Sequence, residues 1–447
     1  MKKLRVAIIG AGPSGFSVAE VLRSERYADY FDVVMYERNG YVGGKCCTVF
    51  DDGSICNDKP GGYEMGAALL SKHTPSYKDL KDIIEKYDVK TTPFREANRT
   101  VFSYVKRGKH ASMKYLSWAY LRRSPPTFLH ALKGYDEYAL DYLKYAGSLH
   151  AGYTNRPPVL SKRLSRLYTK EVSERLAGIM QGFGYADMED RHLTPALLYY
   201  HQYIEPGVFE YPIYKLDNGM QGIWAKIAAT YPTGTIRLNQ EVTRINRMSN
   251  AISVTTPDGT EIYDYVVIAT PLKPALQYLD LDHEQKQFLS RMQHNHYVSV
   301  LCRASGLEAN GTFNIEACYS KKRLGRVVFG YKRYPDSDYI TAYLYVKKGG
   351  RSDDKSIVKV VAKSLHADMG AELVDSQHAK VFHWQDYFGH LRPKDIRAGW
   401  YDDFERYFQG KDRTLFVSSG LHMETVGASV QFGTQEAKKY AKIWARL

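Results

Sequence analysis

The sequence predicts an α/β fold with three parts: a Rossmann-like domain that is discontinuous in the chain, a mixed α+β domain and a helical cap. Three observations lead to this prediction. An apolar run at residues 4–9 passes directly into a glycine-rich turn and a helical pattern. Strand patterns return at 262–269 and at 414–420, where a glycine turn follows. Between 113 and 203 the apolar residues instead follow helical spacing.

The composition is typical of a globular protein with a sizeable core. The 447 residues are 44% hydrophobic and 25% charged, which suits two or three domains. No run of about 18 apolar residues is present, and the apolar stretch 6–9 is too short for a signal peptide, so we expect a cytoplasmic protein without a spanning helix. Five cysteines without a Cys-x-x-Cys pair predict reduced thiols, and the histidines lack metal-ligand spacing, so we expect no metal.

The charge balance favours anionic partners. Lysine and arginine number 62 against 49 acidic residues, a net charge of +13. An acidic substrate, a membrane surface or a nucleic acid would each suit this balance. Zinc-finger spacing, RNP-like segments and long basic runs are absent from the sequence. We therefore expect no nucleic-acid partner, leave peripheral membrane contact open, and draw no expectation about the oligomeric state.

The N-terminal segment has the pattern strand, glycine turn, helix, strand. Residues 4–9 are apolar and β-branched, 16–23 have helical spacing, and 31–36 form a second strand. The glycines of the turn follow the spacing Gly-x-Gly-x-x-Gly between strand and helix, which is the context of a dinucleotide-binding fingerprint.

Each glycine of this turn has a physical role. Gly10 permits the tight turn, Gly12 lets the backbone approach a pyrophosphate, and Gly15 allows the helix to pack closely on the strand. Pro13 and Ser14 lie in the first helical turn, where free N–H groups and the helix dipole favour phosphate. We therefore expect all five residues to contact or position a dinucleotide.

A carboxylate and a second glycine pair extend the fingerprint. Glu37 ends the second strand, where its carboxylate can accept both hydroxyls of an adenosine ribose and would repel the 2′-phosphate of NADP. Glu37-Arg38 is followed by Gly43-Gly44-Lys45, and this arrangement resembles the FAD fingerprint of the flavin amine-oxidase superfamily. The resemblance implies that the cofactor is FAD and that Lys45 lies near a phosphate or the flavin ring.

Further segments match the same superfamily. Residues 241–245 resemble the strand whose backbone contacts adenine, 266–271 resemble the end of the second FAD-domain segment, and 415–431 resemble the final strand and helix beside the flavin pyrimidine. The family commonly has Gly-Glu or Gly-Asp at that last turn, where this chain has Ser419-Gly420. The resemblance implies additional cofactor contacts from Tyr63, Glu64, Met65, Gly66, Ala67, Val242, Thr270, Gly420, Met423 and Val426.

Shorter blocks narrow the resemblance to one group. Residues 42–46, 63–67, 75–77, 183–185 and 398–401 are similar to bacterial polyenoic fatty acid isomerases, also called linoleate isomerases. In that group the flavin takes a hydride from an allylic carbon and returns it to another carbon of the same substrate. The resemblance therefore implies double-bond isomerisation, with 63–67 beside the isoalloxazine.

The same resemblance implies a small apolar, anionic substrate such as an unsaturated fatty acid. An arginine and an aromatic residue hold the carboxylate in that group. Arg99 is the candidate arginine, with Arg95 as its competitor, and Phe209 is the candidate aromatic residue. A guanidinium can bind a carboxylate through two parallel hydrogen bonds.

Two other functions stay open: a flavin-dependent amine oxidase or desaturase with an external electron acceptor, and a non-catalytic FAD-binding protein. No side chain is assigned as catalytic, because the flavin itself carries the chemistry. We expect an FAD-binding domain at 1–70, 217–275 and 395–447, a substrate domain at 71–112, 204–216 and 276–394, and the helical cap at 113–203.

Overall fold

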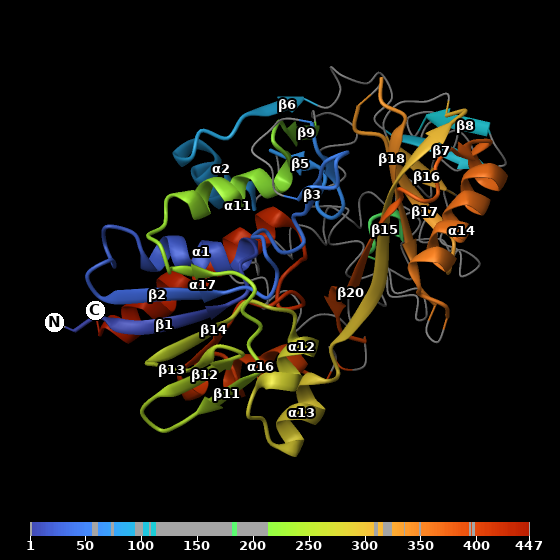
Figure 1. Ribbon diagram of the computed structural model, residues 1–447. Coiled ribbons are helices and arrows are strands. Elements are labelled where there is room, and N and C mark those ends of the chain that lie inside the picture. Colours follow the sequence, from blue (N-terminus) through green and yellow to red (C-terminus); the bar gives the residue numbers. More distant parts are fainter. Residues whose placement is uncertain are drawn as a thin grey trace, which may run out of the picture.

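The computed structural model describes most of the chain in two bodies that face each other (Figure 1). The described residues are 2–55, 61–72, 76–93, 102–106, 109–112, 181–185, 213–307, 312–315, 324–334, 336–347, 350–392, 395 and 398–446. The expected helical cap at 113–203 lies outside these residues, apart from 181–185. Its helical structure and the domain boundaries next to it therefore stay predictions.

A five-stranded parallel sheet forms the middle of the first body, with strands β1 (Leu4–Ile9), β2 (Phe31–Tyr36), β10 (Ile236–Arg237), β14 (Tyr265–Ile268) and β21 (Thr414–Phe416). Their order is β10-β2-β1-β14-β21, so the N-terminal strand lies in the centre and strands from three regions of the sequence flank it. Ile8 pairs with Met35 on one side and Val267 on the other, and all three are buried. This burial on both faces is what a parallel sheet requires.

Two helices that are distant in sequence pack together on this sheet. They are α1 (Pro13–Leu22) and α17 (Val426–Ala445). A Cβ atom at Gly433 would lie 2.0 Å from the Ser17 hydroxyl, so the glycine allows the two helices to approach closely. The helices α2 (Tyr77–Lys86) and α11 (Gly219–Ala229) lie on the same side of the sheet (Figure 1).

The other side of the parallel sheet carries a small antiparallel sheet and three short helices (Figure 1). The strands are β11 (Arg244–Arg247), β12 (Ile252–Thr256) and β13 (Gly259–Tyr263), and the helices are α12 (Leu272–Tyr278), α13 (His283–Leu289) and α16 (Trp400–Tyr407). The continuous strand expected at 262–269 is wrong, because the chain changes sheet at Asp264. The Asp264 amide donates to the Arg5 carbonyl, and its carboxylate accepts from the Arg5 amide, both at 2.8 Å.

The second body is an eight-stranded sheet, with strands β7 (Phe102–Lys106), β8 (Lys109–Ser112), β15 (Gln293–Ser305), β16 (Thr312–Ile315), β17 (Val327–Tyr331), β18 (Tyr339–Tyr345), β19 (Glu372–Leu373) and β20 (Lys380–His390). The order is β19-β15-β18-β17-β16-β7-β8, and β20 pairs with β15. Helix α14 (Asp354–Ser364) and the π-helix η3 (Leu365–Met369) pack on one face, where Val298, Val300 and Val361 are buried. Side chains on the other face point toward the first body and line the cavity described below.

Short strands connect the two bodies. β3 (Thr48–Val49) pairs with β4 (Tyr63–Glu64), and β9 (Ile213–Leu216) lies between β5 (Leu70–Ser71) and β6 (Thr91–Pro93). The 3-10 helix η4 (Lys411–Arg413) precedes β21. None of the helices in the described part of the chain is long and apolar enough to cross a membrane.

Candidate active site

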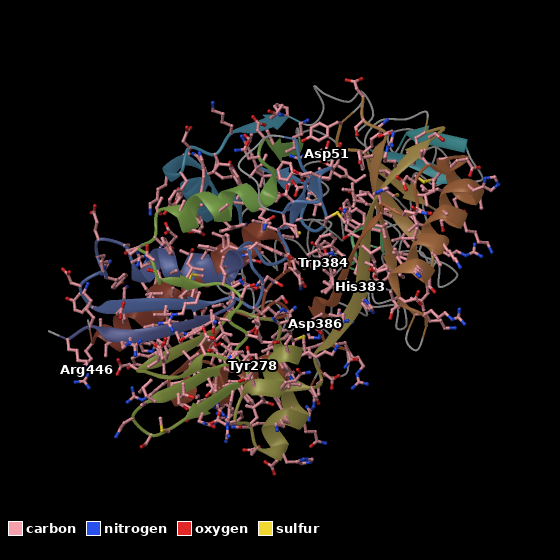
Figure 2. The ribbon with its side chains drawn as sticks, viewed as in Figure 1. Asp51, Tyr278, His383, Trp384, Asp386 and Arg446 are labelled. Carbon is pink, nitrogen blue, oxygen red and sulfur yellow. The ribbon has the colours of Figure 1, made fainter. Side chains whose placement is uncertain are left out.

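A cavity of about 910 Å³ lies between the two bodies. Its lining comes from the loops after β1, β2 and β14 on one side and from β15, β17, β18 and β20 on the other. Figure 2 shows Trp384, His383 and Asp386 along β20, at the boundary that faces the first body, and Tyr278 of α12 on the opposite side. Ligands of parallel α/β sheets bind at this carboxyl edge of the strands.

The glycine turn after β1 forms the first part of the cavity wall. Gly10 has a φ of +107°, a conformation that favours glycine, and Gly12 is the N-cap of α1 without a side-chain cap. Gly10, Gly12, Pro13 and Ser14 line the cavity. Gly15 does not line it; a Cβ atom there would lie 2.1 Å from the Gly10 carbonyl oxygen. The structure thus gives Gly15 the packing role that the sequence predicted.

The carboxylate of Glu37 is fixed at the cavity wall. It is 6% exposed, and its Oε2 accepts from the Ala11 amide at 3.0 Å. Its Oε1 accepts from the Asn39 amide at 3.0 Å and from the Asn39 side chain at 2.7 Å. Arg38 lines the same region. The carboxylate is therefore held in one orientation at the end of β2, where the sequence predicts a contact with the ribose.

The second glycine pair packs against the first turn. The Gly43 amide donates to the Ala11 carbonyl at 2.8 Å, and a Cβ atom at Gly44 would lie 3.1 Å from the Gly12 Cα. Both glycines have positive φ values, +118° and +57°. Gly44 lines the cavity, whereas Gly43 supports it from behind.

Lys45 forms an ion pair that the sequence did not predict. Its ammonium contacts the Glu424 carboxylate and donates to the Asp386 carbonyl at 2.9 Å. Lys45, Glu424 and Asp386 all line the cavity. Glu424 follows β21 in the C-terminal segment, so this pair joins the first glycine-rich loop to the end of the chain beside the cavity.

The block 63–67 is divided between the cavity and the core. Gly66 and Ala67 line the cavity, whereas Tyr63, Glu64 and Met65 are buried behind it. The Tyr63 hydroxyl bonds to Ser337 at 2.8 Å, and the Met65 carbonyl accepts from the Trp384 indole at 3.0 Å.

Glu64 has a set of partners of its own, away from the cavity. Its carboxylate accepts from the Arg333 guanidinium at 2.6 Å, the Met220 amide at 2.9 Å and the Thr48 hydroxyl at 2.9 Å. Burial raises the pKa of Glu64, and the Arg333 charge and the other two donors oppose that rise. Glu64 thus binds protein groups where the sequence predicted a cofactor contact.

The C-terminal segment contributes the start of α17 and the turn before it. Val426 is the first residue of α17 and lines the cavity, and the Thr425 hydroxyl caps the helix by accepting from the Ala428 amide at 3.2 Å. Gly420 and Met423 are predicted contacts that the cavity does not reach; Gly420 packs against Met292. Ser419 lines the cavity, and its buried hydroxyl has no hydrogen-bond partner within the described chain.

His422 is a buried neutral histidine beside the first turn of α1. Its Nδ1 lies 2.8 Å from the Met423 carbonyl, which makes Nδ1 the protonated nitrogen, and its Nε2 lies 3.5 Å from the Ser14 hydroxyl. Burial lowers the pKa of His422 to about 4. The ring therefore faces the cavity as a hydrogen-bond acceptor without charge.

At the other end of the cavity, Val242 and Thr270 line the region expected for adenine. Val242 precedes β11, which begins at Arg244, so the strand expected at 241–245 is shorter than predicted. The Thr270 hydroxyl bonds to the Tyr278 hydroxyl at 2.5 Å. The predicted substrate residues Arg99 and Phe209, and Arg95, lie outside the described residues.

Aromatic side chains form the wall on the side of the second body: Phe183, Tyr185, Tyr297, Phe329, Tyr343, Phe382, Trp384 and Tyr387. The four tyrosine hydroxyls donate to backbone carbonyls, namely Tyr185 to Glu424 (2.8 Å), Tyr297 to Gly182 (2.6 Å), Tyr343 to Glu64 (3.0 Å) and Tyr387 to Phe183 (3.3 Å). Burial raises the pKa values of Tyr297 and Tyr343 well above the ordinary value, so both stay neutral. The wall therefore presents aromatic rings and not free hydroxyls.

Comparison with known protein families identifies the family to which this chain belongs. The model of the flavin-containing amine oxidoreductases matches residues 13–431. The chain belongs to this family. Its cofactor is FAD, as in the family, and the cavity fits that cofactor: a helix N-terminus and an anchored carboxylate lie at the expected pyrophosphate and ribose positions, and Ser419 offers an unsatisfied hydroxyl farther along.

Solved structures share the fold over nearly the whole chain. A CLA-producing fatty acid isomerase from P. acnes has a TM-score of 0.75 at 19% identity and covers 98% of this chain and 99% of its own. A putrescine oxidase bound to putrescine has a TM-score of 0.68 at 15% identity, covering 98% and 99%. Cyclohexylamine oxidase from Brevibacterium oxydans IH-35A has a TM-score of 0.66 at 17% identity, covering 100% and 99%.

A curated protein shares one short segment with this chain. The FAD-binding monooxygenase tazF from Aspergillus terreus is 54% identical over 43 residues, which is 10% of this chain and 8% of that protein. The chain thus spans a small part of that relative.

Proposed function

We propose that this chain is an FAD-dependent isomerase that moves a double bond within an unsaturated fatty acid or a similar apolar acid. The observation that carries the proposal is the aromatic wall, in which the tyrosine hydroxyls are bonded to backbone carbonyls. A surface of this kind favours a hydrocarbon chain, because the tyrosine hydroxyls have no proton left to donate to a polar substrate that would lose its hydration there.

The charges beside the wall support the same choice. The Glu424 carboxylate is paired with Lys45, and the Asp386 carboxylate lies 3.1 Å from the Lys273 ammonium. A substrate ammonium would have to compete with these lysines for either carboxylate. An uncharged carbon chain meets no such competition, and this favours an apolar substrate over an amine.

Bound FAD supplies reversible hydride transfer, which lets one substrate carbon lose a hydride and another gain it. The chain's own residues then have three tasks. The anchored Glu37 and the first turn of α1 hold the cofactor, and the buried aromatic wall excludes water. The stacked rings of Tyr297 and Tyr343 give the carbon chain a rigid apolar surface to lie against. No external oxidant is needed, because the substrate regains the hydride that it gives.

Arg99 and Phe209 complete the proposal as the residues that hold the substrate carboxylate. Their assignment rests on the resemblance to the fatty acid isomerases, and the net charge of +13 agrees with an anionic substrate. The bidentate hydrogen bonding of a guanidinium suits this carboxylate.

The amine oxidase alternative is favoured by the likeness to putrescine oxidase and cyclohexylamine oxidase. Aromatic faces can also hold a cation, so the wall by itself is compatible with an amine. What separates the two functions is the fate of the electrons: an isomerase returns them to its substrate, whereas an oxidase passes them to an acceptor.

The test is anaerobic turnover by the FAD-loaded protein. Linoleate is incubated without oxygen, with the saturated acid stearate as a matched control and putrescine as the competing substrate. Conjugated-diene absorbance that appears with linoleate alone supports the proposal. Lasting flavin bleaching by putrescine, with peroxide release once air is admitted, would identify an amine oxidase. A flavin spectrum unchanged by every compound, together with no conjugated diene from linoleate, would support the non-catalytic alternative.

A further inference from the structure

The cavity wall contains a row of aromatic side chains that crosses the sheet of the second body. In the ladders, Trp384 of β20 pairs with Tyr297 of β15, and Tyr343 of β18 pairs with Phe329 of β17. Tyr297 and Tyr343 connect the two pairs, with stacked rings whose centroids are 5.7 Å apart. Since the strand order is β20-β15-β18-β17, the row leads away from β20, the strand nearest the first body (Figure 1).

The row ends at Phe183, which comes from a different part of the chain. The Phe183 ring packs on Phe329 with centroids 5.2 Å apart and an interplanar angle of 45°. Both residues line the cavity. Phe183 therefore covers Phe329, the last described residue of the row, and could limit how far a ligand extends along it.

Residues 181–185 are anchored to the sheet through their backbone. Three consecutive carbonyls accept hydrogen bonds from side chains of β15 and β20: Gly182 from Tyr297 at 2.6 Å, Phe183 from Tyr387 at 3.3 Å and Gly184 from Asn295 at 3.0 Å. This anchoring leaves the segment little freedom to move away from the row.

Gly184 makes this close approach possible. Its φ is +82°, and a Cβ atom would lie 2.5 Å from the Tyr387 ring and 3.2 Å from the Tyr297 ring. The two rings thus pack directly on the backbone. At the end of the segment, Tyr185 stacks on Tyr387 with centroids 5.8 Å apart, which fixes the segment on the far side of Gly184 as well.

We propose that Phe183 is a specificity residue that sets how far a carbon chain extends into the cavity, and that Gly184 and the three carbonyl bonds are positioning elements that hold it there. The proposal rests on the proposed function in one respect: it assumes a substrate with a linear carbon chain. The identity of the head group and the outcome of the reaction do not enter it.

Chain-length profiles test the proposal on the FAD-loaded protein. Dissociation constants for straight-chain alkyl carboxylates and alkylamines of increasing length are measured from the perturbation of the flavin absorbance. Each added methylene should tighten binding about fourfold until the chain reaches Phe183, where the gain should stop. In Phe183→Ala, and more weakly in Phe183→Leu, the gain should continue to longer chains. Phe382→Ala is the matched control, since it removes a lining aromatic residue from outside the segment.

The profiles decide the proposal independently of turnover. A length limit that moves in the Phe183 variants and stays in Phe382→Ala supports it, whichever head group binds and whether or not linoleate is isomerised. An unchanged limit in both Phe183 variants overturns it, as does an equal shift in Phe382→Ala or the absence of any binding to the native protein. Absence of conjugated diene with a moving length limit would reject the isomerase and keep the role of Phe183.

Discussion

The Glu64 carboxylate and the Arg333 guanidinium form an ion pair of 2.6 Å in which both side chains are at most 1% exposed. The pair joins β4 to the segment after β17, and so ties the first glycine-rich region to the second body. Removal of one partner from a buried pair leaves the other charge uncompensated. We expect Arg333→Met to lower the free energy of unfolding by about 3–5 kcal/mol.

This effect is measured by urea unfolding of the FAD-loaded protein, with intrinsic fluorescence as the signal. The double variant Glu64→Leu/Arg333→Met removes both charges and should recover part of the loss. A single variant within about 1 kcal/mol of the native protein would show that the pair is energetically dispensable, since exposed pairs have that magnitude.

Gly15 should be intolerant of any side chain. Its Cβ atom would lie 2.1 Å from the Gly10 carbonyl oxygen, which is backbone and cannot rotate away. Gly15→Ala should therefore shift α1 relative to the turn and reduce the FAD content of the purified protein, measured as the ratio of flavin to protein absorbance. Gly370→Asn is the control, because Gly370 has positive φ and open space around it. Normal flavin content in Gly15→Ala would refute the packing role.

His422 should make stability fall in acid. Burial lowers the pKa of His422 to about 4, so the folded state binds the proton less readily than the unfolded chain, whose histidines have a pKa of about 6.5. The stability that the neutral His422 ring contributes is therefore present above about pH 6.5 and is lost as the pH falls toward 4. Between pH 7 and pH 5 the loss should be about 2 kcal/mol.

The variant His422→Asn keeps a donor toward the Met423 carbonyl and cannot titrate. Urea unfolding at the two pH values should therefore show a smaller pH-dependent loss in this variant, with exposed His283→Asn as the control. Equal losses in the native protein and in His422→Asn would assign the acid sensitivity to other groups.

The Lys45–Glu424 pair should influence which head group the cavity accepts. Lys45→Met leaves the Glu424 carboxylate, 9% exposed, without its cation beside the aromatic wall. An alkylamine should then bind more tightly relative to the alkyl carboxylate of equal length, by roughly tenfold. Flavin absorbance titrations with decylamine and decanoate measure the ratio.

Two further variants separate this effect from a general disturbance. Lys45→Met/Glu424→Gln should restore the native ratio, because both charges are gone. Lys273→Met should have a smaller effect, since the Lys273 side chain is 56% exposed and its pair with Asp386 is more screened. A ratio that stays constant in Lys45→Met argues that Glu424 does not face the ligand.

The features that the sequence could predict are those encoded within a few neighbouring residues. The βαβ unit follows from apolar runs and glycine spacing inside residues 4–37, and the structure has the expected strands, the helix and the Glu37 carboxylate at the cavity. A strand at 262–269 was also expected from its local pattern, and the structure divides this segment between β13 and β14. The final helix, α17, was expected from the family resemblance.

The features that could not be predicted from the sequence depend on contacts between residues that are far apart in the chain. Glu64 and Arg333 are 269 positions apart, and Lys45 and Glu424 are 379 apart. Nothing near Glu64 in the sequence indicates a buried guanidinium, so resemblance alone assigned it to the cofactor. The bonds from tyrosine hydroxyls to backbone carbonyls also arise only when β15 and β20 meet residues 181–185, and no local pattern predicts them.

The central position of β1 in the parallel sheet determines when the cofactor can be captured during synthesis. The first strand leaves the ribosome early, but one of its neighbours, β14, and the outer strand β21 follow much later, and α17 begins only at Val426. A nascent chain that ends before β14 leaves one edge of β1 unpaired, and a chain that ends before Val426 lacks the helix N-terminus at the cavity. Flavin should therefore bind only after synthesis of residue 426, and until β14 and β21 have been made the growing sheet has an unpaired edge that favours aggregation.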